Sequence, residues 1–304
     1  MRKSSLINNI IILLSYYGEA LTPVPLRPLA LKRWFRKCNG RELHLDPPKT
    51  WCDKINWIKL FGVTPEMKTL SDKFAVRDWI KTRIGEEYLI PLLGAWDRFE
   101  DIDFDALPDR FVLKTNHACN TNMIVLDKSA FDKKAAAKEF RRWMMFDFAF
   151  RFGFQMQYYG IKRKIIAEEF VDNNGSDLMD YKFHCFNGDP VCCEYIGGRS
   201  GKARLAFFDK DWKLVPYRTA TYPVYEVLPE KPSNYEKMTD LAAELSKGFP
   251  YVRVDLYHLN DGSIKFGEMT FTPSSGQCTW LPEGTDEMLG KMIRLPGVNW
   301  DGSC

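Results

Sequence analysis

The sequence is poor in the residue patterns that build zinc sites and disulfide frameworks. Its 304 residues include four histidines, none spaced as H-x-x-H or H-x-x-x-H, and eight cysteines without a C-x-x-C pair. Zinc clusters need such spacings, and disulfide frameworks belong mainly to small secreted domains. We therefore expect neither, and the free cysteines favour a reducing, cytoplasmic environment.

The sequence also lacks a dominant charge, internal repeats and low-complexity stretches. Lys and Arg number 43 against 40 Asp and Glu, which leaves a formal net charge of +3. So balanced a charge gives no support to a nucleic-acid partner, and the absence of repeats excludes a solenoid. Because 45% of the residues are hydrophobic, we expect a substantial globular core. Nothing in the composition indicates an oligomeric state.

No apolar run is long enough to span a bilayer. The run 6–17 follows Arg2 and Lys3 and superficially resembles a signal peptide, but it is short and contains two asparagines. Two interpretations of residues 1–45 stay open: a peripheral contact with the inner face of a membrane, and an ordinary packing helix followed by a loop. The membrane interpretation depends on the basic residues that follow the run, namely Arg27, Lys32, Arg33, Arg36 and Lys37.

The apolar patterns predict an α+β protein with antiparallel sheets. Helices are expected at 129–147 and 234–247. Strands are expected at 88–96, where Pro91 favours an edge strand, at 111–113, 123–126 and 164–171, and then in several hairpins between 180 and 271. We divide the chain into an N-terminal segment (1–45), two lobes (46–170 and 171–297) and a tail (298–304).

The sharpest chemical pattern is a predicted hairpin at 251–270. Arg253, Asp255, Glu268 and Thr270 fall at strand phases that can place their side chains on one sheet face, and pairing across a turn at 260–262 brings Asp255 near Glu268. Two converging carboxylates without a lysine between them favour a hard dication such as magnesium. From the residues alone, a solvated hairpin face with scattered charges fits equally well.

Several segments in order resemble one protein family: KINWIKLFG, LSDKFAVRDWI, IGEEYLIPLLGAWD, DIDFDALPDRFVLKTNH, DYKFHCFNG and SKGFPYVRVDLY. Over about residues 50 to 297, the chain resembles the TupA-like ATP-grasp family of polysaccharide-biosynthesis clusters. Its hairpin resembles the metal-binding hairpin of D-alanine:D-alanine ligases. The resemblance implies the ATP-grasp fold, in which two lobes with antiparallel sheets grip ATP.

The resemblance implies specific roles for the hairpin. Asp255 and Glu268 would hold magnesium ions that bridge the ATP phosphates, with Thr270 where relatives usually carry an asparagine ligand. Arg253 would stabilise the negative charge that develops on an acyl phosphate or tetrahedral intermediate. The following loop would approach the acceptor through its catalytic residues, Ser275 and Gly276.

The resemblance also implies a nucleotide site. Lys73 and Lys114 match two lysines that lie against phosphates. Taken alone, Lys73 is more typical of a solvated surface lysine, whereas Lys114 in an apolar strand fits either interpretation. The segment IIAEEFVD matches the strand whose backbone binds adenine, although its glutamates also fit a sheet margin. The residues implied at the nucleotide are Glu168, Glu169, Phe170, Val171, Asp180 and Lys182.

One segment departs from the family pattern. The loop between the strand lysine and the next strand reads TNHACNTN, without the glycines that let backbone amides close on phosphates. Side chains of this loop are expected to donate hydrogen bonds instead. His117 is the candidate chosen for a phosphate contact, although a lone loop histidine is more often a surface residue.

The predicted activity is that of an ATP-grasp ligase that uses magnesium and ATP to join a carboxylate to an amine through an acyl phosphate. The resemblance implies a uronic acid carboxylate and an amino acid or amine in cell-surface polysaccharide synthesis. Two other functions stay open, because a fold does not dictate an acceptor. One is a kinase or glycosyl-group transferase of the same pathway, and the other is a catalytically inactive binding module.

Overall fold

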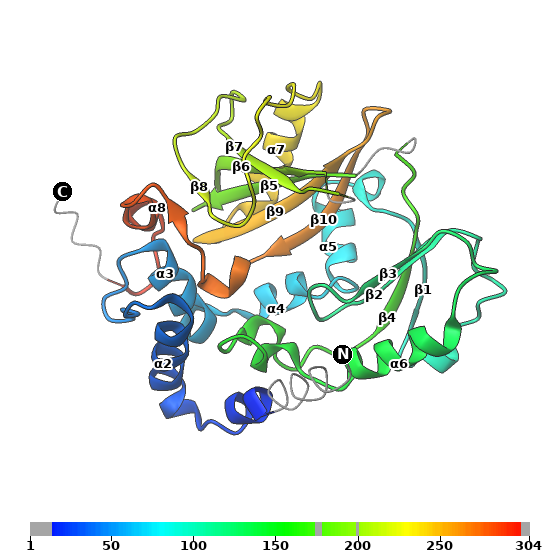
Figure 1. Ribbon diagram of the computed structural model, residues 1–304, viewed down its shortest axis with the longest axis horizontal. Helices are drawn as coiled ribbons and strands as arrows, with labels where there is room; N and C mark the ends of the chain where they lie inside the picture. The colour runs from blue at the N-terminus through cyan, green and yellow to red at the C-terminus, as the bar shows by residue number, and fades with distance from the viewer. Residues whose placement is uncertain (1–13, 174–177, 199–200, 299–304) are drawn as a thin grey trace.

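The computed structural model describes residues 14–173, 178–198 and 201–298, and they form two antiparallel sheets surrounded by helices (Figure 1). The four-stranded sheet has the order β1-β4-β2-β3, with an edge strand that follows Pro91, as the sequence predicts. Its strands are β1 (Leu92–Trp96), β2 (Phe111–Thr115), β3 (Asn122–Val125) and β4 (Ile165–Glu169).

The five-stranded sheet has the order β10-β9-β5-β6-β7 and every neighbouring pair is antiparallel. Its strands are β5 (Met179–Phe186), β6 (Asp189–Gly197), β7 (Arg204–Phe208), β9 (Tyr251–His258) and β10 (Ile264–Thr270). Beside it lies a short pair, β8 (Arg218–Thr219) and β11 (Trp280–Leu281). The predicted α+β class with antiparallel sheets is therefore confirmed.

The helices begin where the sequence offers capping side chains. Thr50 and Asp53 form a capping box at the start of α3, and Asp132 caps α6. The α-helices are α2 (Arg27–Asn39), α3 (Trp51–Trp57), α4 (Pro65–Ser71), α5 (Val76–Arg83), α6 (Lys133–Met144), α7 (Tyr235–Ser246) and α8 (Thr285–Met292). A π-helical turn (Ile58–Gly62) follows α3, and short 3-10 turns occur at Val24–Leu26, Glu86–Tyr88, Phe99–Asp101, Phe148–Phe150, Met156–Tyr158 and Pro273–Gly276.

Strand alternation decides which face of the five-stranded sheet is apolar. Phe183 of β5 stacks on Tyr235 of α7 with ring centroids 5.7 Å apart, so α7 packs against one face. Lys182 and His184 alternate with Phe183 and therefore belong to the opposite face. That opposite face turns toward the four-stranded sheet (Figure 1).

Two hydrophobic cores hold the molecule together. One lies between the four-stranded sheet and α6 and joins Phe111, Leu113 and Ile165 to Phe140. The other joins the five-stranded sheet to α2, α3, α4 and α5 and includes residues from Leu31 onward. The buried core beneath the four-stranded sheet, in the smaller lobe, thus begins at Phe99. This is well after residue 46, where the first predicted lobe starts, because helices α2 to α5 bury their apolar faces against the larger lobe, which is built on the five-stranded sheet.

The N-terminal segment is described from residue 14 onward, so most of the apolar run 6–17 lies outside the described residues. Helix α2 buries Leu31 and Phe35 completely, as the packing interpretation expects. Leu21, Val24 and Leu26 remain more than half exposed beside its basic residues. Within the described residues, no helix is both long and apolar enough to cross a membrane.

Candidate functional site

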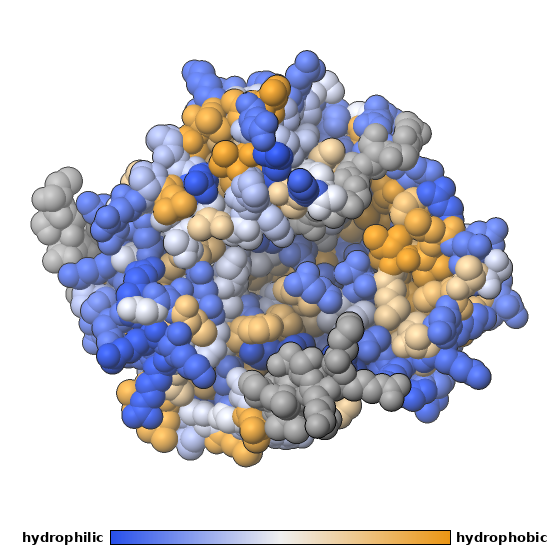
Figure 2. All heavy atoms as spheres, in the orientation of Figure 1, coloured by the Kyte–Doolittle hydropathy of each residue, from blue (hydrophilic) through white to orange (hydrophobic). Residues whose placement is uncertain are grey.

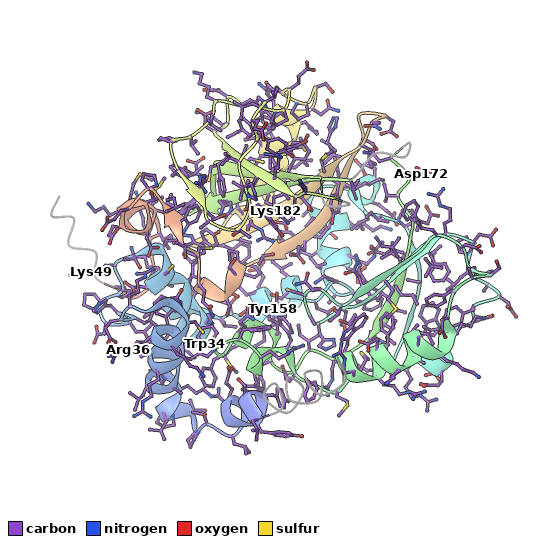
Figure 3. All side chains as sticks on the ribbon, viewed as in Figure 1. Trp34, Arg36, Lys49, Tyr158, Asp172 and Lys182 are labelled. Carbon is purple, nitrogen blue, oxygen red and sulfur yellow. The ribbon has the colours of Figure 1, made fainter. Side chains whose placement is uncertain are left out.

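A cleft of about 1380 Å³ separates the two sheets and is lined by residues from both. Figure 2 shows it as a hollow beside a hydrophobic area on the smaller sheet, where Val112, Ile124 and Leu126 line the cleft. Lys182 lies on β5 above the cleft and Tyr158 lies below it (Figure 3). The four-stranded sheet therefore contributes an apolar patch to the cleft, and the five-stranded sheet contributes charged side chains.

The charged wall is a row of side chains across the five-stranded sheet. Glu268 pairs in register with Asp255, Asp255 with Lys182, and Lys182 with Glu194, and all four line the cleft. A bulge at Gly267 sets two residues of β10 against one of β9 and aligns Glu268 with Asp255. The predicted approach of the two carboxylates is thus present in the structure.

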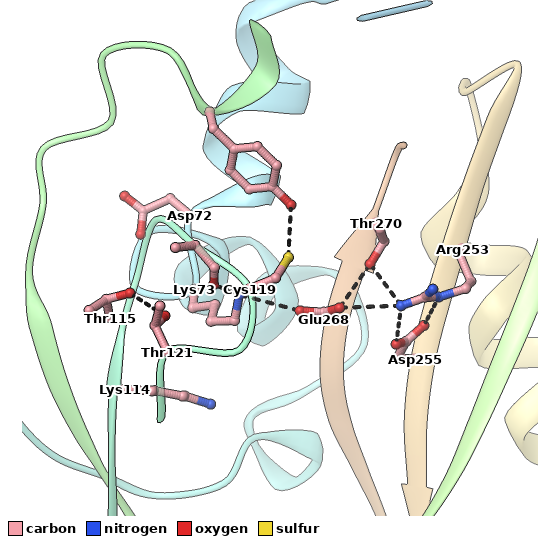
Figure 4. Close-up of polar contacts among 12 residues, drawn as sticks. Asp72, Lys73, Lys114, Thr115, Cys119, Thr121, Arg253, Asp255, Glu268 and Thr270 are labelled. Carbon is pink, nitrogen blue, oxygen red and sulfur yellow. Dashed lines mark hydrogen bonds and ion pairs between the residues drawn. The ribbon is translucent and has the colours of Figure 1, made fainter. Parts of the chain in front are cut away.

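Arg253 joins the hairpin's polar side chains (Figure 4). Its Nε donates to Asp255 at 2.6 Å, and its Nη2 donates to Asp255 at 2.7 Å, to Thr270 at 3.2 Å and to Glu268 at 3.3 Å. Burial opposes the charged guanidinium, but Asp255 outweighs it and raises the pKa of Arg253. Three oxygen-bearing side chains therefore converge on one positive charge.

The carboxylates have lysine partners that the strand pattern alone does not reveal. Lys182 hydrogen-bonds Asp255 within its own sheet, and Lys73 reaches Glu268 at 3.3 Å (Figure 4). Burial alone would raise the pKa of Glu268, but Lys73 and Arg253 hold it well below its usual range. The expected absence of a compensating lysine is therefore wrong, because Lys73 and Lys182 come from other parts of the chain.

On the opposite wall, Lys114 and Glu168 form an ion pair at 2.6 Å, on adjacent strands β2 and β4. Arg77 from α5 contacts the same carboxylate at 3.1 Å and donates to the carbonyl of Ile90. Both Lys114 and Glu168 line the cleft, and the other cleft-lining residues among the predicted nucleotide contacts are Lys73, Glu169, Phe170, Val171, Asp180 and Lys182. The structure thus brings these predicted residues to one cleft.

The glycine-free loop 115–122 is closed by its own polar groups. The hydroxyls of Thr115 and Thr121 lie 2.6 Å apart, and Asn116 hydrogen-bonds Asp72 and the backbone of Lys164. Asn120 has φ of 55°, a left-handed conformation that asparagine tolerates better than most residues.

The prediction that His117 contacts phosphate is not supported by its position. Its side chain is 2% exposed and does not line the cleft, although its neighbours Thr115 and Ala118 do. Burial lowers the pKa of His117 to about 4, so the imidazole is neutral at physiological pH. The loop conformation turns this residue inward, and its role as a phosphate contact is withdrawn.

The predicted acceptor loop has two different outcomes. Ser275 lines the cleft, and its hydroxyl donates to the carbonyl of Phe152 while Lys59 donates to it at 3.0 Å. Gly276 does not line the cleft; its carbonyl accepts from Asn56 of α3 at 3.0 Å. Gly276 therefore packs against α3, and its position gives no support to the predicted catalytic role.

Several residues of the site were missed in the sequence. Asn56 and Lys59 are polar positions inside an apolar helical run, and both are fully buried beneath the acceptor loop. His184 and Glu194 interrupt apolar strands at phases that match Lys182, and both line the cleft. A polar residue at an apolar phase is the signal that could have identified them.

The hairpin has the donor chemistry of a magnesium site. Asp255, Glu268 and Thr270 offer hard oxygen ligands, and they already converge on the cationic Nη2 of Arg253. Among the described residues, no group of three or more His, Cys, Asp or Glu side chains could hold a metal by itself. Magnesium would thus fit here with further oxygen ligands from a nucleotide, as it commonly does.

Two lobes with antiparallel sheets and a charged cleft between them are the architecture of the ATP-grasp fold. The model of the TupA-like ATP-grasp family matches residues 53–294, which is most of the chain. The chain belongs to the TupA-like ATP-grasp family. Both the family and the fold predicted from the sequence are confirmed.

Solved structures show limited similarity. D-cycloserine synthetase is 15% identical, with a TM-score of 0.39 over 68% of this chain and 64% of its own. D-alanine–D-alanine ligase from Bacillus anthracis is 16% identical, with a TM-score of 0.39 over 66% and 56%. An L-amino acid ligase from Bacillus licheniformis is 13% identical, with a TM-score of 0.44 over 74% and 49%. The chain thus spans less than two thirds of each of these proteins, and no curated protein matches it.

Proposed function

We propose that the chain is an ATP-dependent carboxylate–amine ligase that forms an amide through an acyl phosphate. The observation that carries this proposal is the convergence of Asp255, Glu268 and Arg253 on one wall with Lys73 reaching across to Glu268. Acidic groups for a metal and permanent cations for phosphates are the elements that phosphoryl transfer requires. The family assignment supports the same enzyme class.

Each of these side chains has a task in the proposed reaction. Asp255, Glu268 and Thr270 would hold magnesium, which when bound neutralises phosphate charge. Lys73 and Lys114 would hold the phosphates of ATP as compact positive charges. Catalysis then depends mainly on positioning and on charge neutralisation.

Arg253 would stabilise the negative charge that develops in the reaction. Its side chain is 13% exposed, and its guanidinium is fixed by Asp255 and directed at the oxygens of the hairpin, so it needs little reorganisation to stabilise an acyl phosphate or a tetrahedral intermediate. The apolar wall formed by Val112, Ile124 and Leu126 suits the base of the nucleotide. Backbone groups of Glu169 to Val171 at the end of β4 would select adenine.

The proposed substrates are a uronic acid carboxylate and an amino acid or amine, joined during synthesis of a capsule, O-antigen or teichuronopeptide. This part of the proposal rests on the resemblance to the TupA-like family. A kinase or glycosyl-group transferase of the same pathway would use the same metal and nucleotide residues. A ligase is distinguished from both because it releases inorganic phosphate only when a carboxylate and an amine are both present.

Calorimetry of magnesium-dependent ATP binding tests the site. We expect Asp255→Asn and Glu268→Gln to weaken binding by more than tenfold, because each removes a charged ligand, roughly 1.5 to 3 kcal/mol. Glu244→Gln is a matched control outside the cleft, where the half-buried Glu244 pairs with Lys247 and Arg83. If the parent binds no ATP in magnesium, the active-ligase proposal is wrong and an inactive module takes its place.

We also propose that the N-terminal segment contacts the inner face of a membrane. The exposed Leu21, Val24 and Leu26 stand next to Arg27 and the other cations of α2, a combination typical of interfacial helices. Co-sedimentation with vesicles of phosphatidylglycerol, but not phosphatidylcholine, would support this contact. Equal sedimentation after Leu21→Ser and Val24→Ser would contradict it.

A further inference from the structure

One carboxylate on the charged wall has no task in the proposed nucleotide site. Glu194 of β6 is 7% exposed and lines the cleft. Lys182 stands between Glu194 and Asp255 in the cross-strand row, and strand spacing separates the two carboxylates by about 10 Å. Glu194 therefore lies outside the group of oxygens that converges on Arg253.

Glu194 stays ionised in this position. Burial alone would raise its pKa, but His184, Arg253 and Lys182 lower the pKa below its usual value. Among the described residues its ion-pair partner is His184, whose Nε2 lies 3.6 Å away, longer than a hydrogen bond. A buried carboxylate without a close cationic partner is costly, so the site favours a cation supplied from the cleft.

The histidine beside it offers a second acceptor. Nδ1 of His184 lies 2.7 Å from the hydroxyl of Tyr251, and burial lowers the pKa of His184, which favours the neutral ring. If Nδ1 carries the proton and donates to Tyr251, Nε2 is an acceptor, and it is then Arg253 and Lys182, not the neutral His184, that lower the pKa of Glu194. Nε2 is buried and has no hydrogen-bond partner within the part of the chain that the structure describes.

A third polar atom lines the same end of the cleft. Thr219 of β8 is 4% exposed, and its hydroxyl also lacks a partner among the described residues. Thr219 pairs in register with Trp280, whose ring lies 5.9 Å from the ring of His184. Buried polar atoms normally have partners, so acceptors left without one point to a ligand with several donors.

We propose that Glu194, His184 and Thr219 form the subsite that binds the ammonium group of the amine substrate. The proposal rests on the ligase function proposed above. An ammonium group has several N–H donors and a positive charge, which match the Glu194 carboxylate, the Nε2 of His184 and the hydroxyl of Thr219.

The location of this subsite suits amide formation. His184 pairs in register with Arg253, so the ammonium group would lie one strand away from the guanidinium that serves the acyl phosphate. Lys182 stands between Glu194 and Asp255 in the row and hydrogen-bonds Asp255. After the ammonium passes one proton to Nε2 of His184, the neutral amine would meet the activated carboxylate along one sheet face.

Binding of probe amines tests the subsite. The probes are the twenty L-amino acids and glucosamine, titrated by calorimetry into the parent saturated with magnesium and ADP. We expect at least one probe to bind the parent and to bind Glu194→Gln at least tenfold more weakly, since the charge is removed while the shape is kept. Thr219→Val should weaken the same probe by a smaller factor, and Glu244→Gln should leave it unchanged.

The outcomes separate this subsite from the ligase proposal. Glu194→Gln should bind magnesium ATP as tightly as the parent, whereas loss of nucleotide binding would make Glu194 part of the metal or nucleotide site and overturn the assignment. Equal amine affinity in parent and variant, or no probe bound by a parent that binds nucleotide, would also overturn it. Failure of the parent to bind nucleotide would instead contradict the ligase function. Where turnover is found, hydroxylamine, which is uncharged at neutral pH, should remain an acceptor for Glu194→Gln. The KM for the cationic amine should rise in the same variant.

Discussion

The close approach between the acceptor loop and α3 gives a quantitative prediction for Gly276→Ala. A Cβ at Gly276 would lie 2.5 Å from Nδ2 of Asn56 and 3.3 Å from the side chain of Ile55. Asn56 is fully buried, and it donates to the carbonyls of Gly276 and Cys52 and accepts from Lys59. Its side chain cannot move without breaking these bonds.

The magnitude follows from two costs. Alanine at φ of 70° costs about 1 kcal/mol, and displacing Asn56 leaves buried groups unsatisfied at a further cost of about 1 to 3 kcal/mol. The matched control is Gly284→Ala, where φ is 87° and nothing lies within 4 Å of the added Cβ, so only the backbone cost of about 1 kcal/mol remains. Urea unfolding, followed by tryptophan fluorescence, should show Gly276→Ala as the less stable variant by about 1 to 3 kcal/mol.

Equal destabilisation of the two variants would refute the close packing of this loop on α3. Magnesium ATP affinity gives an independent check, because Gly276 does not line the cleft. The folded Gly276→Ala protein should therefore bind nucleotide like the parent.

Two further predictions concern buried titratable groups. Burial lowers the pKa of Lys59 from 10.5 to about 7, so the unfolded chain binds more protons than the folded chain between these pH values, and the free energy of unfolding should rise with pH across that window. Lys59→Met should reduce this dependence of the unfolding free energy on pH, measured by urea unfolding. An unchanged pH dependence would contradict the lowered pKa of Lys59. His117 is neutral and lies away from the cleft, so His117→Leu should leave magnesium ATP affinity unchanged in calorimetry, whereas a tenfold loss would restore its role as a phosphate contact.

Local physics accounts for the parts of the site that could be predicted from sequence. Arg253, Asp255, Glu268 and Thr270 lie on one hairpin, where strand alternation and a short turn decide which side chains share a face. The edge position of β1 and the strand pair β2–β3 follow from Pro91 and from the apolar runs in the same way. These features need no knowledge of the rest of the chain.

Contacts between distant segments could not be derived from spacing. Lys73 approaches Glu268 only because α4 and α5 pack in the core of the larger lobe, and resemblance to a family, rather than periodicity, selected this lysine. The inward position of His117 and the packing of Gly276 on α3 could not be predicted, because a loop's sequence does not fix which of its residues turn inward. Lys59 and Glu194 were missed because a polar residue at an apolar phase indicates a buried polar group but does not indicate which cleft or partner its side chain faces.

The pairing of charges in the cleft leads to a last prediction, on the order in which ligands bind. Asp255 is already neutralised by Arg253 and Lys182, and Glu268 by Arg253 and Lys73, so a magnesium ion alone would have to displace these cations from both carboxylates. ATP changes this balance, because its phosphates offer new partners to Lys73 and Arg253 and leave the carboxylates to the metal. We therefore expect calorimetry to detect little magnesium binding without nucleotide, and ATP affinity to rise at least tenfold when magnesium is added, a coupling of about 1.4 kcal/mol or more. Glu268→Gln should reduce the coupling while leaving weak, metal-free ATP binding. Tight magnesium binding in the absence of nucleotide would contradict this argument, since it would mean that Arg253 and the lysines do not hold the carboxylates in solution.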